Sequence, residues 1–100
     1  MEYGEKKTIV ITFEVERQPG IFFAVAKSED MGLESDRANS SNNSANDLWW
    51  AMEGAFRDLM ARGWTQRLDL KRKAEDVELK PAKQKILERL EAFWTSLGFK

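Results

Sequence analysis

The chain has neither cysteine nor histidine among its 100 residues. Without cysteine, no disulfide can stabilise this small protein and no thiolate chemistry is possible. Without either residue, zinc, copper and haem sites lose their usual ligands, and catalytic triads built on histidine cannot form. Glycine-rich phosphate loops and Gly-x-Ser-x-Gly elbows are also missing from the sequence. We therefore expect no metal, no cofactor and no enzymatic activity.

An excess of charge of one sign is missing as well. The 16 basic and 17 acidic residues leave a formal net charge of −1, which argues against a dedicated duplex-DNA binder because such proteins neutralise many phosphates. The longest apolar run, Ile21 to Ala26, is far too short to span a bilayer, and the charged start of the chain lacks the apolar region of a signal peptide. We expect a cytoplasmic protein of a cell, phage or mobile element, with no membrane partner.

Aromatic residues, by contrast, are abundant, with four tryptophans and six phenylalanines. Each of these side chains can bury roughly 150–250 Å², so the chain can form a core without disulfides. A length of 100 residues leaves room for one core only. We expect a single domain over residues 1–100.

The first quarter of the chain has the pattern of a β-hairpin. Apolar and polar residues alternate over residues 8–16, which predicts a half-buried strand. Pro19 and Gly20 favour a tight turn, because proline presets φ and glycine accepts a positive φ. The run over residues 21–26 is predicted as the partner strand, with its odd-numbered residues on the apolar face of the first strand.

A polar stretch over residues 28–43 is predicted as a loop that includes one short strand near residues 31–35. A helix is expected to begin at Ser44, whose spacing to Asp47 is that of a capping box. The apolar residues that recur at helical spacing are Leu48, Met52, Ala55, Phe56 and Leu59. Gly63 is predicted to end this helix in the left-handed conformation.

Alternation returns from Trp64 to Lys73, which predicts a lysine-rich edge strand. Pro81 favours the start of a second helix, and Gly98 favours its end. The apolar residues at helical spacing between them are Ile86, Leu87, Leu90, Phe93, Trp94 and Leu97. The predicted fold is α+β: an antiparallel sheet of three to four strands with two helices packed on it, in the order β-β-(β)-α-β-α, and with Leu90 in the core.

Trp49 and Trp50 are the leading candidates for a functional site. Adjacent residues on a helix point about 100° apart, so Trp49 lies at the margin of the apolar stripe. Trp50 points away from the stripe, beside a notch left by Gly54. Either the second helix covers Trp50, or Trp50 anchors a protein–protein contact, because tryptophan is enriched at binding hot spots. We assign Trp49, Trp50 and Arg57 to a partner-binding set, the partner being a target protein or a second copy of the chain.

The one concentration of basic residues is a second candidate site. Its members are Trp64, Arg67, Lys71, Arg72 and Lys73. Positive charge beside an aromatic side chain can hold single-stranded nucleic acid through phosphate contacts and stacking. Asp69 interrupts the run and two acidic residues follow it, so a solubilising edge strand is the competing interpretation.

Residues 7–72 resemble the N-terminal domain of HicB-type antitoxins. The matching segments are Ile9 to Glu14, Gly20 to Ala26, Asp30-Met31-Gly32-Leu33, and Asp47 to Leu59. The family commonly has proline where this chain has Met31, and residues 74–100 supply one amphipathic helix in place of the family's DNA-binding segment. The resemblance implies a fold related to double-stranded-RNA-binding domains that sequesters a protein and does not bind an operator.

The sequence therefore favours a non-catalytic protein-binding module, antitoxin-like or a phage-type inhibitor, that occludes the surface of another protein. A homodimer would use the tryptophan pair in the same way. The alternative is a binder of single-stranded nucleic acid or RNA that uses the basic segment from Trp64 to Lys73. Titrations at two salt concentrations distinguish the alternatives, because phosphate contacts weaken steeply with salt.

Overall fold

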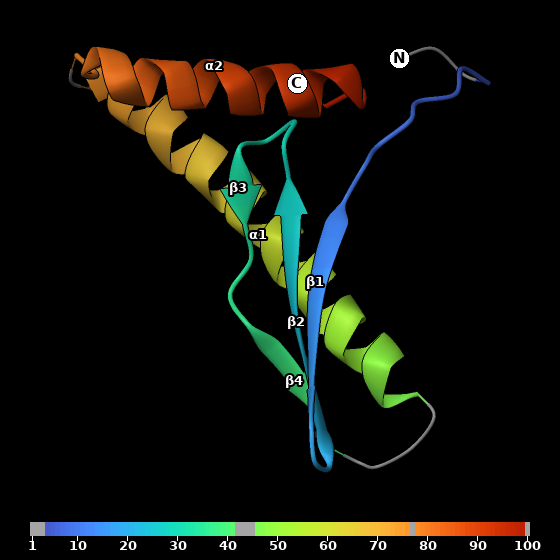
Figure 1. Ribbon diagram of the computed structural model, residues 1–100. Coiled ribbons are helices and arrows are strands. Elements are labelled where there is room, and N and C mark those ends of the chain that lie inside the picture. Colours follow the sequence, from blue (N-terminus) through green and yellow to red (C-terminus); the bar gives the residue numbers. More distant parts are fainter. Residues whose placement is uncertain (1–3, 42–45, 77, 100) are drawn as a thin grey trace.

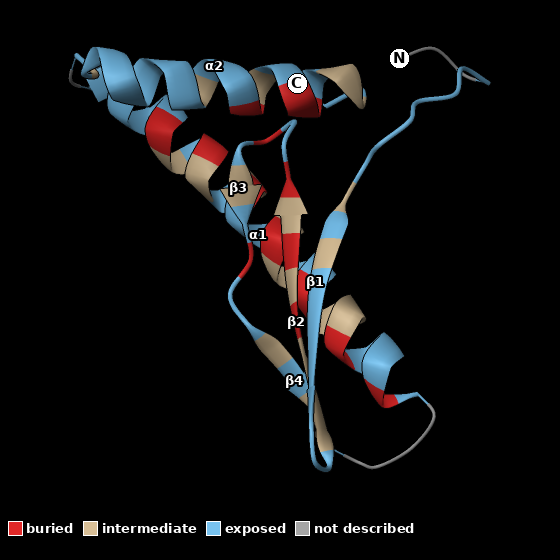
Figure 2. Ribbon diagram, viewed as in Figure 1, coloured by how far each residue is buried: buried red, intermediate tan, exposed pale blue. Residues whose placement is uncertain are grey.

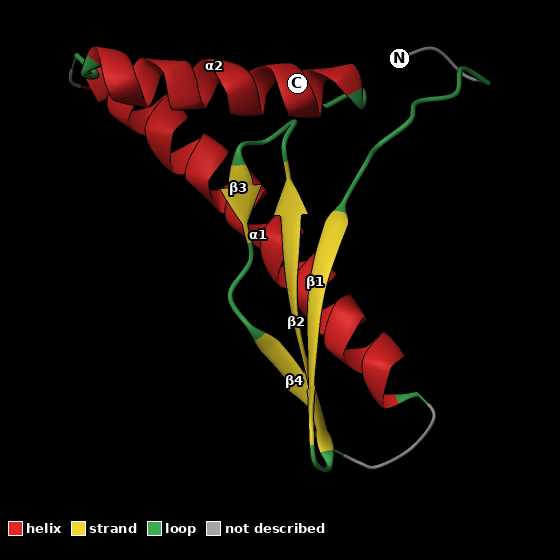
Figure 3. Cartoon of the chain, in the orientation of Figure 1, coloured by secondary structure: helices red, strands yellow, loops and turns green. Residues whose placement is uncertain are grey.

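The computed structural model describes residues 4–41, 46–76 and 78–99, which form one antiparallel sheet and two helices (Figures 1 and 3). In chain order the elements are β1 (Thr12–Gln18), β2 (Ile21–Ser28), β3 (Leu33–Glu34), β4 (Ala38–Ser40), α1 (Asp47–Asp76) and α2 (Pro81–Ser96). The prediction of an α+β fold with an antiparallel sheet and two helices is confirmed.

β1 and β2 form the predicted hairpin. Pro19 and Gly20 form its turn, and Gly20 has a φ of 76°, which a residue with a side chain rarely adopts. The first strand begins at Thr12, four residues later than predicted, and continues to Gln18. Gln18 pairs with Ile21 across the turn, so the loop contains only two residues. A loop this short fixes the register of the whole hairpin.

The sequence analysis predicted the wrong set of β2 residues for the inner, apolar face of the sheet. Val15 of β1 pairs with Ala24, and Glu16 pairs with Phe23. The odd-numbered residues of β2 therefore lie with the glutamates of β1 on the outer face of the sheet, and not with the apolar residues of β1. The residues that face α1 include the small and buried Ala24 and Ala26. Small side chains on this face allow the helix to approach the sheet closely.

β3 and β4 pair with opposite ends of the other edge of β2. β3 lies within residues 31–35, where a short strand is predicted, whereas β4 lies in a stretch predicted as loop. Between them, Ser35 Oγ accepts a hydrogen bond from the Ala26 amide at 2.9 Å and donates one to the Asp36 carbonyl at 2.8 Å. This side chain continues the hydrogen bonding where the strand breaks, so β3 and β4 act as one interrupted strand.

α1 is a single helix of 30 residues. The prediction that it ends at Gly63 and gives way to a strand over Trp64–Lys73 is wrong. This segment is rich in arginine, lysine and leucine, which are strong helix formers. Gly63, Arg67 and Leu70 are buried at helical spacing, so a period of 3.6 rather than 2 describes the segment. The predicted start at Ser44 lies outside the described residues, and among those described α1 begins at Asp47.

The two helices are not equivalent in their packing. α1 covers the inner face of the sheet, where it contacts chiefly β2 and β4, while α2 packs on the C-terminal half of α1 (Figure 1). α2 begins at Pro81 as predicted, and the Phe99 amide donates to the Trp94 carbonyl beside Gly98, which has a φ of 96°. Figure 2 shows the buried residues between these layers. Leu90 is buried as predicted, with no exposed surface.

Three segments meet at Gly63. A Cβ atom at this position would lie 2.6 Å from Met31 Sδ and 3.7 Å from the indole of Trp94. The glycine therefore serves close approach between the turn after β2, α1 and α2, and does not end the helix. Arg89 of α2 donates a hydrogen bond to the Asp30 carbonyl at 3.1 Å in the same turn. Both helices thus hold the turn that follows β2.

The substitution Gly63→Ala tests this close approach. A methyl group against the buried Met31 costs about 1–3 kcal/mol by overpacking, which outweighs the gain of about 1 kcal/mol from alanine in a helix. We expect urea unfolding to show net destabilisation. In a Met31→Ala background the methyl group has room, so the same substitution should stabilise the protein. An effect of the same sign in both backgrounds would contradict the packing at Gly63.

Candidate protein-binding surface

Large apolar side chains are exposed on the first turns of α1. The exposed fraction is 65% for Trp49, 52% for Trp50 and 40% for Phe56. On the opposite side of the same turns, Ala51 and Ala55 are completely buried against the sheet. The small residues of this half of α1 thus form the core contact, while the largest ones lie in solvent. Large aromatic side chains exposed this close together on one helix make these turns a candidate interaction site.

The exposed aromatic residues project from two sides of α1. Trp49 and Phe56 are seven residues apart and share one side, with the partly buried Met52 between them. Trp50 projects about 100° away from Trp49, and Arg57 follows Trp50 by seven residues on its side. The structure thus places all three predicted partner-binding residues on the exposed part of α1. Phe56 is predicted as part of the core stripe, and its exposure is a correction.

Arg57 belongs to an ion pair on this surface. Its Nη2 atom donates to Glu53 Oε1 at 2.6 Å, and its side chain is 76% exposed. Trp49, Glu53 and Arg57 follow one another at four-residue spacing and form one ridge along α1. We call these three residues the α1 ridge. It combines one aromatic side chain with two opposite charges, so it carries no net charge.

The second helix does not cover Trp50. α2 contacts α1 around Trp64 and Arg67, which lie roughly 20–25 Å along the helix axis from Trp50. The predicted notch at Gly54 is also wrong. A Cβ atom at Gly54 would lie 3.2 Å from the Ala38 Cβ, so this glycine lets α1 approach β4. Trp50 is therefore a surface residue of the chain and not part of a helix–helix core.

One member of the alternative, basic site is buried, and a second is partly buried beside it. Arg67 is 1% exposed, and its Nε atom donates to Glu91 of α2 at 3.0 Å. The Arg67 guanidinium also lies 4.9 Å from the ring centroid of Trp64, which packs edge-on against Trp94 at 5.0 Å. Arg67 thus joins the two helices and is inaccessible to a phosphate group. No sequence signal distinguishes this arginine from its exposed neighbours except its helical spacing to Gly63.

The other basic residues remain exposed, and two of the three share one carboxylate. Arg72 and Lys73 bind Asp69 at 3.0 and 3.1 Å. The hydrogen bond from Lys73 is the main reason that the pKa of Asp69 lies below its ordinary value. Lys71 is exposed on the same stretch of α1. The structure therefore separates the five predicted nucleic-acid residues into a buried arginine with the partly buried Trp64 beside it, and three exposed cations, two of which share one carboxylate.

Glu91→Ala tests the structural role of Arg67. The variant leaves a buried guanidinium without its carboxylate, and removal of one partner of a buried pair costs about 3–5 kcal/mol. Because Glu91 is 31% exposed, we expect a loss near the lower end of that range in denaturant unfolding. Lys71→Ala is the control and should change stability by less than about 0.5 kcal/mol. Equal effects of the two substitutions would contradict the interior role.

The outer face of the sheet carries a feature that the sequence analysis missed. The Arg37 guanidinium lies 3.6 Å from the ring centroid of Phe23 and binds Glu16 at 2.6 Å. On the same face, Lys27 binds Glu14 at 2.7 Å. The glutamates of β1 mark the solvent side of the hairpin, and correct pairing across the two-residue turn would have placed Phe23 beside them.

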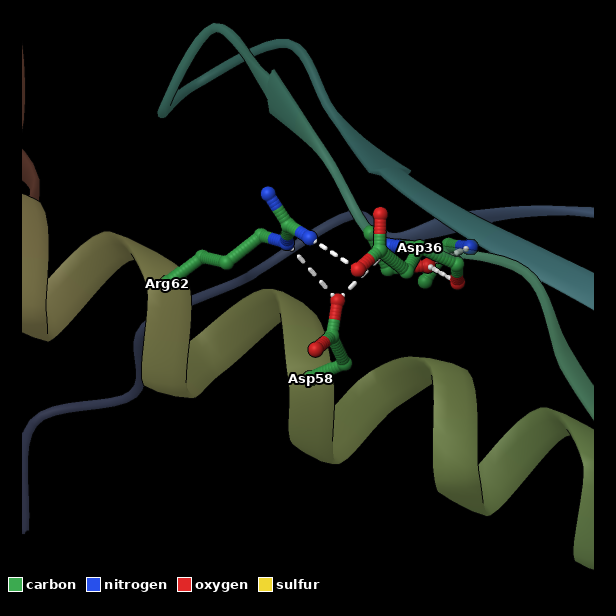
Figure 4. Close-up of polar contacts among 5 residues, drawn as sticks. Asp36, Asp58 and Arg62 are labelled. Carbon is green, nitrogen blue, oxygen red and sulfur yellow. Dashed lines mark hydrogen bonds and ion pairs between the residues drawn. The ribbon is translucent and has the colours of Figure 1, made fainter.

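A polar cluster joins the segment between β3 and β4 to α1 (Figure 4). Asp58 accepts hydrogen bonds from the Asp36 amide at 2.7 Å and from Arg62 Nε at 2.8 Å, and Arg62 also pairs with the Asp36 carboxylate. The Arg62 hydrogen bond, together with that of the Asp36 amide, holds the pKa of Asp58 below its ordinary value. The cluster fastens the interrupted strand to the helix. Among the described residues, no group of three or more acidic side chains is placed to hold a metal.

The pH dependence of stability tests the role of Asp58. Because its pKa is lowered on folding, the carboxylate contributes stability above its ordinary pKa of 3.8, and this contribution is lost as the pH falls through the lower, folded-state pKa. We expect Asp58→Asn to be less stable than the wild type at neutral pH. The difference should shrink when urea unfolding is repeated below pH 3.8. A difference that is independent of pH would contradict this assignment.

No protein-family model matches the chain, and comparisons with curated proteins and with solved structures likewise find no match. Neither helix, as far as its residues are described, is long and apolar enough to cross a bilayer. The functional argument therefore depends on the surface of α1 and on the sheet beside it.

Proposed function

We propose that the chain is a non-catalytic protein-binding module that docks against another protein through the N-terminal half of α1 and occludes part of that protein's surface. The observation that carries this proposal is the exposure of Trp49 and Trp50 on a helix anchored to the sheet by buried alanines. Tryptophan supplies a large contact area and is enriched at binding hot spots.

The anchoring of α1 favours tight binding by these residues. Ala51, Ala55 and Leu59 have no exposed surface, and Asp58 binds the interrupted strand from the same helix. A surface on a rigid element loses little conformational entropy when a partner docks, so more of the contact energy appears as affinity. The charged pair of Glu53 and Arg57 supplies a polar rim beside the aromatic residues.

Binding is favoured over catalysis by the way in which ionisable groups are used. The carboxylates near the surface features described above are engaged in ion pairs with arginine or lysine, as in the pairs of Glu16 with Arg37 and Asp58 with Arg62. In these pairs both charged partners are engaged in contacts within the chain. The arrangement suits a specific docking surface with balanced charge.

The role that we propose is that of an antitoxin-like module or a phage-type inhibitor acting in the cytoplasm. The resemblance to HicB-type antitoxins supports this role through the hairpin, the short β3 and the helix on one sheet face. The resemblance also implies a strand after that helix, and this part of α1 is helical instead. Occlusion of a partner protein needs only the shared part.

Trp50→Ala tests the proposed surface. A target protein is captured from native lysate on the immobilised chain, identified and purified, and its affinity is then measured by calorimetry. We expect the substitution to weaken binding by at least about 2 kcal/mol, the usual threshold for a hot spot. Stability of the free chain should be unchanged, since Trp50 is half exposed. Loss of monomer stability without loss of affinity would contradict the proposal.

The control variant is Leu68→Ala, which removes an apolar side chain of similar exposure, 47%, from the C-terminal half of α1. It should leave the affinity for the target unchanged. Single-stranded oligonucleotides are titrated in parallel at low and moderate salt. Binding that weakens steeply with salt and is lost in Lys71→Ala would favour the nucleic-acid alternative and overturn the protein-binding function.

A further inference from the structure

The chain has more exposed surface than a compact monomer of its mass. Its accessible surface is 7351 Å², whereas about 5,800 Å² is typical of a monomer of 11.6 kDa. Its radius of gyration is 16.2 Å, against about 13 Å for a compact domain of 100 residues. Figure 1 shows the cause: the N-terminal half of α1 and the whole of α2 lie at opposite ends of a flat molecule of 49 × 35 × 17 Å.

Some of the exposed apolar surface lies on the side of α1 that bears Trp49 and Phe56. The α1 ridge begins on this side at Trp49 and runs obliquely through Glu53 to Arg57, which lies on the side of Trp50. The ridge is self-complementary. When two copies are placed antiparallel about a two-fold axis beside Glu53, the Trp49 of each faces the Arg57 of the other.

We infer that a second copy of the chain occupies this side of α1, so that two α1 helices pack antiparallel across a two-fold axis. The inference rests on the proposed function in one respect, namely that the N-terminal half of α1 is a protein interface. The Arg57 guanidinium stacks on the indole of Trp49 across the interface, where a cation–π contact is favourable. The two Glu53–Arg57 pairs form a neutral group of four charges at the centre.

A standard interface buries about 800 Å² per partner, and the excess surface of about 1,500 Å² is spread over the whole chain, so the exposed Trp49 and Phe56 side chains would supply only the centre of such an interface. Trp50 lies about 60° around the helix from Glu53 at the two-fold axis and about 20° from Arg57, so it lies at the edge of the helix pair. The dimer and the target thus use adjoining surfaces of one helix.

Pairing through the exposed edge of β1 is a less favourable way for two copies to form a dimer. Antiparallel pairing of β1 with its own copy would set Glu14 and Glu16 of both chains side by side on the outer face. Like charges on neighbouring strands are destabilising. The two-fold axis on the α1 ridge also brings together two glutamates, the Glu53 of each copy, but the Arg57 side chains that pair with them lie one turn away and balance their charge.

Sedimentation equilibrium of the full chain tests the inference by charge exchange. Arg57→Glu leaves two glutamates on the ridge, and Glu53→Arg leaves two arginines, so each variant alone should self-associate at least about tenfold more weakly than the wild type. Mixed in equal amounts, the two variants carry opposite charges and should form a heterodimer more tightly than either self-associates. Circular dichroism of Arg57→Glu should match the wild type, because Arg57 is 76% exposed, and urea unfolding of Glu53→Arg checks that this variant is folded, because the Glu53 side chain is only 30% exposed.

Two further variants locate the interface. Trp49→Ala should weaken self-association by about 30-fold or more, which corresponds to a hot-spot residue. Leu68→Ala, the matched apolar control, should change it by less than about threefold. A wild-type chain that stays monomeric up to about 1 mM, or variants that fail to associate better when mixed, would overturn the inference.

Failure of the dimer and failure of the proposed function are distinguishable. A monomeric chain that still binds its target through Trp50 would overturn the dimer and leave the protein-binding function in place. A chain that dimerises through Trp49 but binds no target protein would support the dimer and remove the occluding function. The two tryptophans therefore serve as separate probes of the two sides of α1.

Discussion

The close approach at Gly63 determines where every other part of the molecule can lie. The absence of a side chain at Gly63 allows Met31 and Trp94 to meet against α1, so the turn after β2 and the second helix share one contact point. Arg67 and Glu91 then join the helices one turn further along. Because α2 is fixed at this junction, it packs on the C-terminal half of α1 and leaves the N-terminal half to the sheet alone.

Because α2 covers only the C-terminal half of α1, the N-terminal half of the helix has an exposed aromatic side. The sheet is narrow and offers small residues, Ala24 and Ala26, to the helix, so the matching residues of α1 are also small. The larger residues of the first turns have no layer to cover them, since α2 lies some 20 Å away along the axis. An aromatic side chain at such a position adds little to the core of a monomer, and in the function that we propose it contributes through association.

The hairpin and the second helix could be predicted from the sequence because local signals decide them. Pro19 and Gly20 dictate their turn, and Pro81 and Gly98 bracket α2. The second half of α1 could not be predicted. Its buried residues at helical spacing are Gly63, Arg67 and Leu70, and only Leu70 is a large apolar residue. The strand-like alternation of Trp64, Leu68 and Leu70 was misleading, since Trp64 packs on α2 whereas Leu68 faces solvent.

The candidate site could be predicted from the sequence because helical period alone decides which side of a helix faces away from the core. Trp49 and Trp50 are adjacent, so a helix cannot bury both of them on one side. What surrounds them depended on tertiary contacts that no local pattern encodes, including the position of α2 and the approach of Gly54 to β4. Under the proposed function, one helix would serve both folding and binding. Arg67 and Gly63 in its C-terminal half hold the junction with α2. Trp49 and Trp50 lie far from that junction, so we expect substitutions there to change association without weakening it. A partner that binds only the folded chain would in turn stabilise the whole helix by mass action.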